Sequence, residues 1–309
     1  MELIRGLHNL RPRHVGCVAT IGNFDGVHLG HQAVLGQLAE KGRELGLPTT
    51  VIIFEPQPLE FFQPGKVPPR LTRLREKLQA LDQYSVDRVL CINFNERFAQ
   101  LSAETFIHEL LVEGLGVKYL VVGDDFRFGK NRSGNFTTLQ HAGKNDGFDV
   151  VAMQNFTVDG ERVSSTLVRE ALEKADLRRA EKLLGRPYRM CGRVAHGDKI
   201  GQTLGIPTAN IALHRKRSPL YGIFIVEVFG LDREPVWGAA SIGTRPTVGG
   251  TNALLEIHLL DFSDQIYGKH LQINFLHKIR DEKKFDTMDA LKARMQEDIN
   301  ETRNWFSTH

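Results

Sequence analysis

The segment Thr20-Ile-Gly-Asn-Phe-Asp-Gly-Val-His-Leu-Gly-His31 follows an apolar run at residues 15–21. It precedes a helical pattern that places Val34, Leu35 and Leu38 on one face. An apolar run, a glycine-rich stretch and an amphipathic pattern in this order predict a strand, a turn and the start of a helix. The rest of the chain can be read outward from this turn.

The turn carries features that suit a phosphate. Gly22, Gly26 and Gly30 allow tight bends and a close approach of the backbone to a ligand. The start of the next helix offers backbone N–H groups and the positive end of its dipole. His28 and His31 are three residues apart, so one helical turn points them the same way. Two imidazoles there can donate hydrogen bonds to charge that develops on a phosphoryl group.

The pattern His-x-Gly-His directly after Gly-x-Phe-Asp-Gly resembles the signature of the nucleotidyltransferase superfamily. A metal pair is the alternative, but only Asp25 adds a ligand type nearby, so we rank it lower. We therefore expect ATP to bind at this turn, against Phe24 and Asp25 as well as Gly22 and Gly26.

Length and composition indicate an ordinary soluble globular protein with room for two domains. The chain has 309 residues, of which 41% are hydrophobic and 25% charged, and a net charge of +3. This mildly basic balance permits ATP and does not demand nucleic acid. Cys17, Cys91 and Cys191 lie far apart in apolar runs, which predicts buried thiols in a reducing compartment. No run has the length of a signal or membrane segment, so we expect a cytoplasmic protein without a membrane partner.

The first half alternates predicted strands and helices. Strands are expected at residues 15–21, 50–54, 86–94, 117–122 and 148–153, and helices at residues 71–81 and 102–115. This alternation predicts an α/β domain with a parallel sheet covered on both faces. Ligands of such sheets bind beyond the carboxyl ends of the strands. We therefore expect one ligand-binding site to be bordered by the loops after Gly22, Phe54, Phe94 and Gly123.

Two further loops of this half suit a nucleotide. Residues 123–134 combine aromatic, basic and acidic side chains, which fits a flat polar ring with phosphates; a solvated turn with Phe126 and Phe128 in the core is the alternative. The run at residues 163–169 contains hydroxyls that can cap a helix over 166–174, and Arg169 can add donors to triphosphate oxygens.

The pattern changes near Gly185-Arg-Pro187. A short helix at residues 175–184 is expected to end at Gly185. Beyond it, strands are expected at residues 188–194, 221–229, 236–242, 254–260 and 271–275, followed by a helix at 287–304. Short strands with glycine turns predict a small antiparallel barrel, and the apolar stripe Met288, Leu291, Met295 and Ile299 predicts a terminal helix packed on it.

The second half has its own candidate phosphate loop. Residues 192–199 approach a Walker A loop but depart from it, because Asp198 precedes Lys199 and no Ser or Thr follows. Downstream, Thr208 and Asn210 flank Ala209, so in a strand both oxygens face one Mg²⁺, although Pro-Thr-Ala-Asn could equally form a turn.

One strand of the second half carries a candidate base. Glu256 and His258 lie on one face of the strand at 254–260 and leucines and isoleucine on the other. An exposed face is the alternative interpretation. The basic run at residues 214–217 is most simply a solvated loop.

Taken in order, these segments closely resemble the bacterial bifunctional riboflavin kinase/FMN adenylyltransferase family, also called FAD synthetases. The markers are residues 22–31, 123–129, 164–169, 205–210, 255–258 and 279–285, and the resemblance covers essentially the whole chain. It implies a Rossmann-like adenylyltransferase domain at residues 1–186 and a flavokinase barrel at 187–309. Riboflavin would be phosphorylated to FMN, and FMN adenylylated to FAD with release of pyrophosphate.

The resemblance also implies roles for individual residues. His28 and His31 would bind ATP phosphates and stabilise adenylyl transfer, and Glu256 would be the general base of the kinase. The remaining implied residues are Ser164, Ser165, Thr166 and Arg169 for the triphosphate, Asp125 and Arg280 for the flavin, Gly197, Lys199 and Gly201 for the kinase ATP, and Thr208 and Asn210 for Mg²⁺ and ATP. Some family members have Asn at position 125, so its charge is not essential.

Both reactions are displacements at phosphorus, which need positioning and charge stabilisation and no protein nucleophile. Asp261 and Asp264 are rival bases to Glu256. An adenylyltransferase for another cofactor precursor is the nearest alternative function, and Thr208, Asn210 and Glu256 argue against it. A flavin- or RNA-binding regulator is the non-enzyme alternative, but the barrel lacks the interleaved aromatic and basic residues that single-strand binding favours.

Overall fold

A computed structural model describes residues 1–153, 156–197, 200–215, 217–247 and 250–308. The chain forms two compact units. The N-terminal unit comprises Met1–Pro68 and Thr72–Ser164, and the C-terminal unit comprises Pro69–Leu71 and Ser165–His309. Each unit is described by itself. Helices α7 and α8, which precede the change of pattern near Gly185, belong by their contacts to the C-terminal unit.

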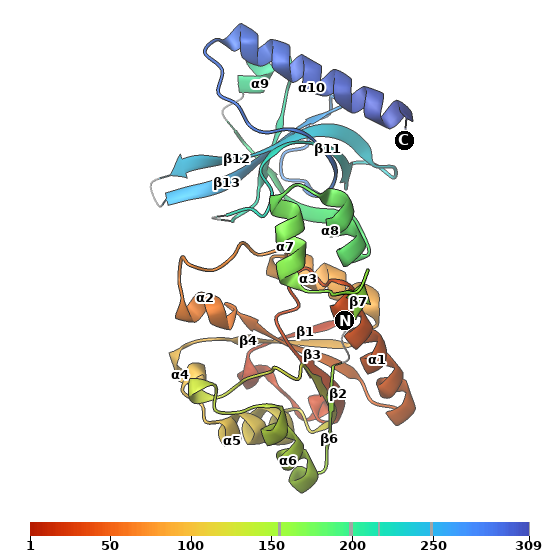
Figure 1. Cartoon of the computed structure of the whole chain (residues 1–309), viewed down its shortest axis with the longest axis vertical. Helices are drawn as coiled ribbons and strands as arrows, with labels where there is room; N and C mark the ends of the chain where they lie inside the picture. Colours follow the sequence, from red (N-terminus) through yellow and green to blue (C-terminus); the bar gives the residue numbers. More distant parts are fainter. Residues whose placement is uncertain (154–155, 198–199, 216, 248–249, 309) are drawn as a thin grey trace. The chain divides into compact units, whose positions relative to one another are not determined.

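The N-terminal unit is built on a six-stranded parallel sheet (Figure 1). Its strands, in the order in which they pair, are β1 (Glu2–Arg5), β4 (Arg88–Asn93), β3 (Thr49–Glu55), β2 (Cys17–Ile21), β5 (Val117–Val122) and β6 (Asp149–Ala152). The parallel sheet predicted from the alternation is confirmed, and the strands ahead of the four candidate loops are neighbours. The short edge strand β1 was not predicted, because four residues give too little pattern.

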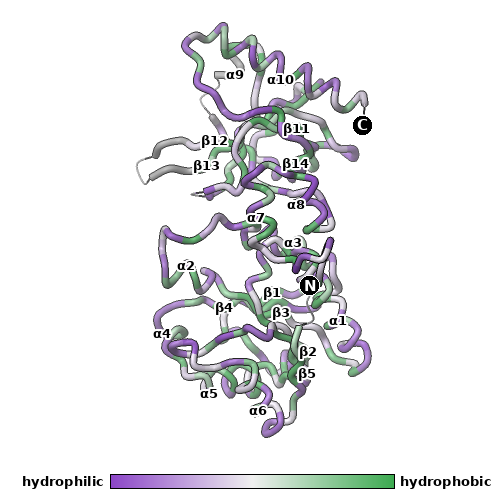
Figure 2. The backbone as a smooth tube through the Cα atoms, in the orientation of Figure 1, coloured by the Kyte–Doolittle hydropathy of each residue, from purple (hydrophilic) through white to green (hydrophobic). Residues whose placement is uncertain are grey.

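Helices cover both faces of this sheet, since the strand side chains alternate between two cores. One core joins Ala19, Ile52 and Leu90 to helices α5 (Ala103–Phe106), η4 (Ile107–Gly114) and α6 (Phe136–Asp146). On the other face, α1 (Leu29–Leu45) and α3 (Leu74–Leu81) cover the sheet. The shorter elements are η1 (Leu7–Asn9), η2 (Pro12–His14), α2 (Pro58–Phe62), η3 (Asp82–Tyr84), α4 (Glu96–Ala99), η5 (Lys130–Arg132) and the hairpin β7 (Thr157–Val158) with β8 (Glu161–Arg162). Figure 2 shows the hydrophobic colour concentrated on the central strands.

The helix expected at residues 102–115 is not uniform. It starts as α5 and continues as the π-helical segment η4, whose wider turn lets Leu115 N donate to Leu110 O. Gly114 permits this geometry, because a Cβ there would lie 2.7 Å from Glu109 O.

The C-terminal unit contains the predicted antiparallel barrel, which is closed, and the predicted terminal helix; α7 and α8 also belong to it. The barrel strands, in the order in which they pair, are β10 (Ala209–Ala212), β13 (Gly250–Leu259), β12 (Val236–Thr247), β11 (Gly222–Phe229), β14 (His270–Arg280) and β9 (Tyr188–Ala195). The helices are α7 (Ser165–Glu173), α8 (Leu177–Leu184), α9 (Ile200–Thr203) and α10 (Met288–Thr308). Strand β10 resolves the choice left open for Pro-Thr-Ala-Asn in favour of a strand that begins at Ala209.

Helices α7 and α8 and a short strap from the first half pack in the C-terminal unit. Helix α8 contacts β9 and β14 and ends at Gly185, whose φ of 71° suits a residue without a Cβ. The strap Pro69–Leu71 is held through its carbonyls. Arg169 Nε donates to Pro69 O at 2.8 Å and Tyr188 Oη to Leu71 O at 2.9 Å.

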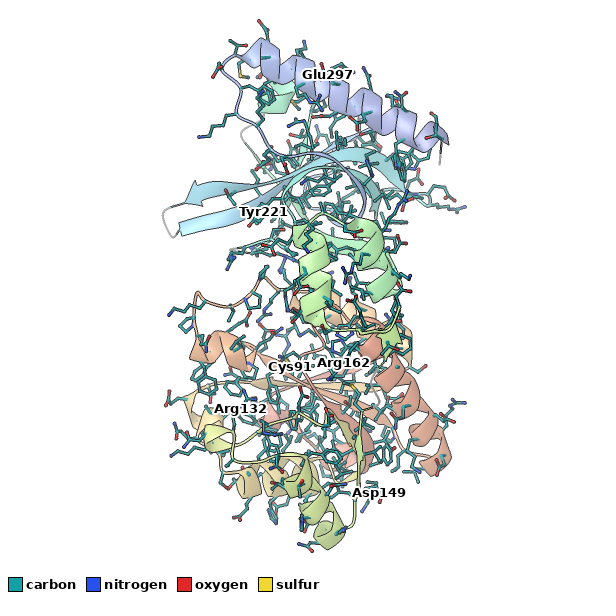
Figure 3. All side chains as sticks on the ribbon, in the orientation of Figure 1. Cys91, Arg132, Asp149, Arg162, Tyr221 and Glu297 are labelled. Atoms are coloured by element: carbon teal, nitrogen blue, oxygen red, sulfur yellow. The ribbon has the colours of Figure 1, made fainter. Side chains whose placement is uncertain are left out.

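The terminal helix α10 packs on the barrel with part of its predicted stripe. Ile299 is buried with Met295 against Ile206 and Leu260. Met288 is instead 49% exposed, because α10 begins at this residue. Figure 3 shows all the side chains, including the solvent-exposed Glu297 of α10, which pairs with Arg294 at 2.6 Å. In the described ranges, no helix has both the length and the apolar character needed to cross a membrane.

Candidate active sites

The predicted phosphate turn of the N-terminal unit holds its two histidines face to face. His28 caps α1, and its Nδ1 accepts a hydrogen bond from His31 N at 3.4 Å. The two rings stack with their centroids 3.7 Å apart. A histidine whose Nδ1 accepts a hydrogen bond carries its proton on Nε2 when it is neutral. The turn therefore offers an imidazole N–H donor at the start of a helix.

The residues around the histidines mainly set the shape of the turn. Asp25 is buried, and its Oδ1 accepts hydrogen bonds from Thr72 N at 2.9 Å and Thr72 Oγ1 at 3.1 Å. Gly26 has a φ of +85° and donates its N–H to Thr72 Oγ1 at 2.9 Å. Phe24 is also buried, with its ring centroid 4.8 Å from that of His31. Asp25 and Phe24 thus brace the turn from inside the protein.

Two glycines of the turn are needed for close packing. A Cβ on Gly22 would lie 3.2 Å from the ring of Phe24. On Gly30 it would lie 3.2 Å from His28 Nδ1 and 3.4 Å from Val163 O. The chain just before Ser164 therefore runs beside the histidine turn.

The other predicted triphosphate residues follow directly in the chain. Ser164 is the last residue of the N-terminal unit and stands at the N-cap position of α7. Ser165, Thr166 and Arg169 belong to α7 in the C-terminal unit. There Arg169 Nε donates a hydrogen bond to Pro69 O.

The loops after β2 and β5 flank the point where the strand order reverses, because β3 and β5 lie on opposite sides of β2. Such a switch point is where ligands of open parallel sheets bind. Asp125 is exposed in the turn after β5, and a Cβ on Gly123 would lie 2.8 Å from its Oδ1. The structure thus places Asp125 at the same edge of the sheet as the histidine turn.

Sequence reasoning missed a row of aromatic rings at this edge, which we call the phenylalanine row. Phe54 is the penultimate residue of β3, Phe94 follows β4, and their ring centroids are 5.8 Å apart. The row continues by contacts of 4.9–6.0 Å through Phe98, Phe106, Phe128 and Phe126. The alternative interpretation of Phe126 and Phe128 as core residues holds, since both pack in the core. Counting phenylalanines at strand ends would have revealed the row.

In the C-terminal unit, two predicted kinase residues lie opposite each other on neighbouring strands. Asn210 on β10 pairs with Glu256 on β13, and Glu256 pairs with Ser241 on β12. Residues directly opposite each other in antiparallel strands share a face. The strands therefore carry Asn210, Glu256 and Ser241 as one polar row. Ser241 was not predicted.

Glu256 and Ser241 of this row line a cavity of about 240 Å³ between the barrel and α10. Its polar lining includes Thr208, Ser241, Glu256 and His258, with Gly201 beside them. The apolar lining consists of Ile206, Ile223, Ala239, Ala240, Phe285, Leu291, Met295 and Ile299. Glu256 is thus in a cavity wall, and the alternative of a merely exposed face does not hold. The cavity suits a ligand with one flat apolar part and one polyol part.

Two glycines of the loop at residues 197–205 fit against the predicted Mg²⁺ residues. A Cβ on Gly197 would clash with the carboxamide of Asn210. On Gly201 it would lie 3.2 Å from Thr208 Oγ1. Lys199, the remaining residue predicted for this loop, lies outside the described residues.

Arg280, predicted to contact the flavin, lines the cavity but is already engaged. Its Nε and Nη2 donate to the two carboxylate oxygens of Asp298 on α10, at 2.9 and 2.7 Å. Arg294 Nη2 adds a contact of 3.1 Å to Asp298. Arg280 thereby ties the end of β14 to α10 and shapes the cavity.

The rival bases lie elsewhere. Asp261 accepts two hydrogen bonds from Arg303, at 2.7 and 2.8 Å, and these hold the pKa of Asp261 below its usual value. Neither Asp261 nor Asp264 lines the cavity. Glu282 does line it, at the rim, and partial desolvation raises the pKa of its carboxyl while Ser241 Oγ donates to it at 3.3 Å.

The fold and these two constellations define a protein with a nucleotide-binding α/β unit and a ligand-binding β-barrel unit. The family model described as FAD synthetase matches residues 10–167, and the one described as riboflavin kinase matches 184–306. The chain belongs to the family of bifunctional riboflavin kinases/FMN adenylyltransferases. It is an enzyme of flavin-cofactor biosynthesis with both activities, and its substrates and products are riboflavin, FMN, FAD and ATP.

Similar proteins match along the full chain. The bifunctional riboflavin kinase/FMN adenylyltransferase of Escherichia coli (strain K12) is 53% identical over 307 residues, which cover 99% of this chain and 98% of that protein. That of Haemophilus influenzae is 49% identical and covers both chains in full. A crystal structure described as a macrolide-efflux protein from Streptococcus pneumoniae matches with a TM-score of 0.83 and 29% identity, over 99% of this chain and all of that one.

Proposed function

We propose that riboflavin is phosphorylated in the cavity of the C-terminal unit and that FMN is adenylylated at the histidine turn of the N-terminal unit. The observation that carries the kinase assignment is the single cavity that joins Glu256 and Thr208 to an apolar wall. Riboflavin has the same division into a flat ring and a ribityl chain.

In the kinase reaction, the terminal ribityl oxygen attacks the γ-phosphorus of ATP as the bond from that phosphorus to the bridging oxygen breaks. FMN and ADP result, and Glu256 accepts the proton of the attacking hydroxyl. Such assistance contributes about 10²–10⁴-fold in rate. The position of Glu256 in the cavity wall, with Asp261 bound to Arg303, supports this role.

We propose Thr208 and Asn210 as the protein ligands of Mg²⁺. Mg²⁺ usually takes one or two protein oxygens together with phosphates and waters. A hydroxyl and a carboxamide with two glycines packed against them fit such a site, since a glycine backbone can approach phosphates closely. The bound ion would neutralise charge on the phosphates, and Thr208 and Asn210 would orient it beside Glu256. We extend the phosphate loop to Gly197, Gly201 and Lys199 on the family motif.

In the adenylyl transfer, a phosphate oxygen of FMN attacks the α-phosphorus of ATP, and pyrophosphate leaves. His28 and His31 donate hydrogen bonds to the charge that develops there. The helix start and the Nε2–H of His28 support this assignment. Ser164, Ser165, Thr166 and Arg169 are proposed to hold the triphosphate on the basis of the family motif.

For the flavin of the adenylyltransferase, we propose the phenylalanine row and Asp125 at the carboxyl edge of the sheet. Stacked and edge-on aromatic rings favour a flat conjugated ligand. Phe62, which contacts Phe94 at 5.7 Å and is 61% exposed, offers an open ring at one end. The buried thiols Cys17, Cys91 (labelled in Figure 3) and Cys191 support a reducing, cytoplasmic location.

The experiment is product analysis by chromatography with riboflavin, ATP and Mg²⁺. Wild-type protein is expected to form FMN and then FAD. Glu256→Gln is expected to stop FMN formation and still convert supplied FMN to FAD. Normal FMN formation by folded Glu256→Gln would remove Glu256 as the base.

A further inference from the structure

His258 lines the cavity without a role in the chemistry proposed so far. It lies on β13 two residues after Glu256, so both side chains share a face of the strand. Its Nδ1 is 2.9 Å from the carbonyl oxygen of Pro207. A carbonyl oxygen can only accept, so Nδ1 carries a proton and donates it. The imidazole is therefore oriented by a specific bond to the residue before Thr208.

This bond acts on a short and restricted piece of chain. The ring of Pro207 fixes its φ, and the hydrogen bond to its carbonyl fixes the peptide group that leads into Thr208. The chain then enters β10, where Ala209 pairs with Ile257 and Asn210 with Glu256. Strand β13 thus holds the chain on both sides of Thr208. His258 binds the carbonyl of Pro207 before it, and Ile257 pairs with Ala209 after it.

The other side of Thr208 is set by the loop before it. Ile206 N donates to Gly201 O at 2.8 Å, which closes the loop. The bare Cα of Gly201 faces the Thr208 hydroxyl, where a Cβ would lie 3.2 Å from Oγ1. A Cβ on Gly201 would also clash with Ile206 O, so the close packing of this loop against Thr208 requires glycine at position 201.

We propose that His258 is a positioning residue of the kinase, which aims the Thr208 hydroxyl at Mg²⁺–ATP by anchoring the Pro207 carbonyl. Strand β13 then serves both substrates, with Glu256 toward the flavin hydroxyl and His258 toward the nucleotide loop. This inference rests on the proposed assignment of Thr208 to Mg²⁺–ATP. Outer-shell partners of this kind typically change metal affinity or activity by about 10- to 100-fold when they are removed.

The test compares His258→Ala, His258→Asn and His258→Gln in the full-length protein, with binding of Mg²⁺–ADP measured by calorimetry without riboflavin. The amide nitrogen of Asn can take the place of Nδ1, whereas that of Gln lies nearer the place of Nε2. We expect His258→Ala to weaken Mg²⁺–ADP binding by about 10- to 100-fold. His258→Asn should restore most of the affinity, and His258→Gln should restore less. Any rise in the KM for riboflavin should be smaller than the loss of Mg²⁺–ADP affinity.

Two controls separate the possible failures. Urea unfolding followed by circular dichroism reports that the barrel of each variant is folded, and Thr208→Ala tests the assignment on which the inference rests. If Thr208→Ala weakens Mg²⁺–ADP binding and His258→Ala does not, the positioning role is wrong. An Asn variant as weak as the Ala variant would also contradict it, as would equal losses for riboflavin and nucleotide. If Thr208→Ala itself has no effect, the proposed Mg²⁺ assignment fails instead.

Discussion

At the scale of single residues, the two sites differ in how their polar groups are prepared. His28 and His31 stack at a helix start, and the Nδ1 of His28 is occupied by the backbone of His31. The kinase carboxylate Glu256 instead lies in a row of strand side chains with Asn210 and Ser241. The histidine turn therefore presents hydrogen-bond donors, which suits the proposed adenylyl transfer. The barrel presents a proton acceptor, which suits the proposed activation of the riboflavin hydroxyl.

The first residue prediction concerns His28. His28→Ala removes a donor to the transferred phosphoryl group and the cap of α1. Loss of one such donor typically costs about 2.7–4 kcal/mol of transition-state stabilisation, which is about 10²–10³-fold in rate. Conversion of FMN to FAD should fall by this factor, and formation of FMN from riboflavin should continue. Equal loss of both reactions would point to misfolding instead.

The second concerns Glu282, whose pKa is raised because the protein partly desolvates its carboxyl. The folded state then binds the proton more tightly than the unfolded state. This contribution to stability is complete below the ordinary pKa of glutamate and is lost as the pH rises through the raised value. Glu282→Gln should therefore gain stability relative to wild type from mildly acidic to neutral pH, measured by urea unfolding. The control is Asp281→Asn at the neighbouring exposed residue. The same gain in stability with rising pH in this variant would contradict desolvation of Glu282 as the cause.

At the scale of elements, sequence patterns were most informative where burial repeats regularly. Strand β2 is buried at all five positions, and α1 buries Val34, Leu35 and Leu38, so both were predicted closely. Strand β1 was not predicted and β10 was left open against a turn, because each has four residues and neither forms a continuous apolar run. The Asn210–Glu256–Ser241 row depends on strand pairing between distant segments, which a single sequence does not specify. Motif resemblance supplied Glu256, but Ser241 has no local signal.

The element prediction concerns the attachment of α10. Asp298 is buried and pairs with Arg280 and Arg294, so Asp298→Ala leaves two guanidinium groups without this carboxylate. Removing one partner of a buried ion pair costs about 3–5 kcal/mol, and the partial exposure of Arg294 makes the lower end the expectation. The variant should unfold at a lower urea concentration, and its KM for riboflavin should rise. Asp289→Ala, in the exposed first turn of α10, is the matched control, and an equal effect there would contradict this account.

At the scale of the whole molecule, the order of the sequence and the compact units do not coincide. The FAD synthetase model ends at residue 167 and the riboflavin kinase model begins at residue 184. The compact units instead divide after Ser164, and the strap Pro69–Leu71 belongs to the C-terminal unit. Helix α8 buries Leu177, Ala180, Leu183 and Leu184 within that unit. A barrel cut at Pro187 would expose the surface that this helix covers.

A fragment comparison tests that point. Residues 165–309 should unfold at a higher urea concentration than residues 187–309, because only the longer fragment retains α7 and α8. Both fragments contain the cavity, and neither should form FAD. Circular dichroism and riboflavin phosphorylation measure the outcome. Equal stability of the two fragments would show that α8 adds nothing to the barrel.

The two sites are proposed to act in sequence, with FMN that the barrel releases serving as the substrate of the histidine turn. The most direct measurement mixes two full-length variants with riboflavin, ATP and Mg²⁺ and follows FAD by chromatography. Glu256→Gln alone should make FMN about 10²–10⁴-fold more slowly than the wild type, and His28→Ala with His31→Ala alone should make FMN with little FAD. The mixture should make FAD, because FMN released by one variant is adenylylated by the other. A mixture that makes no FAD, although each variant performs its remaining reaction, would contradict this claim.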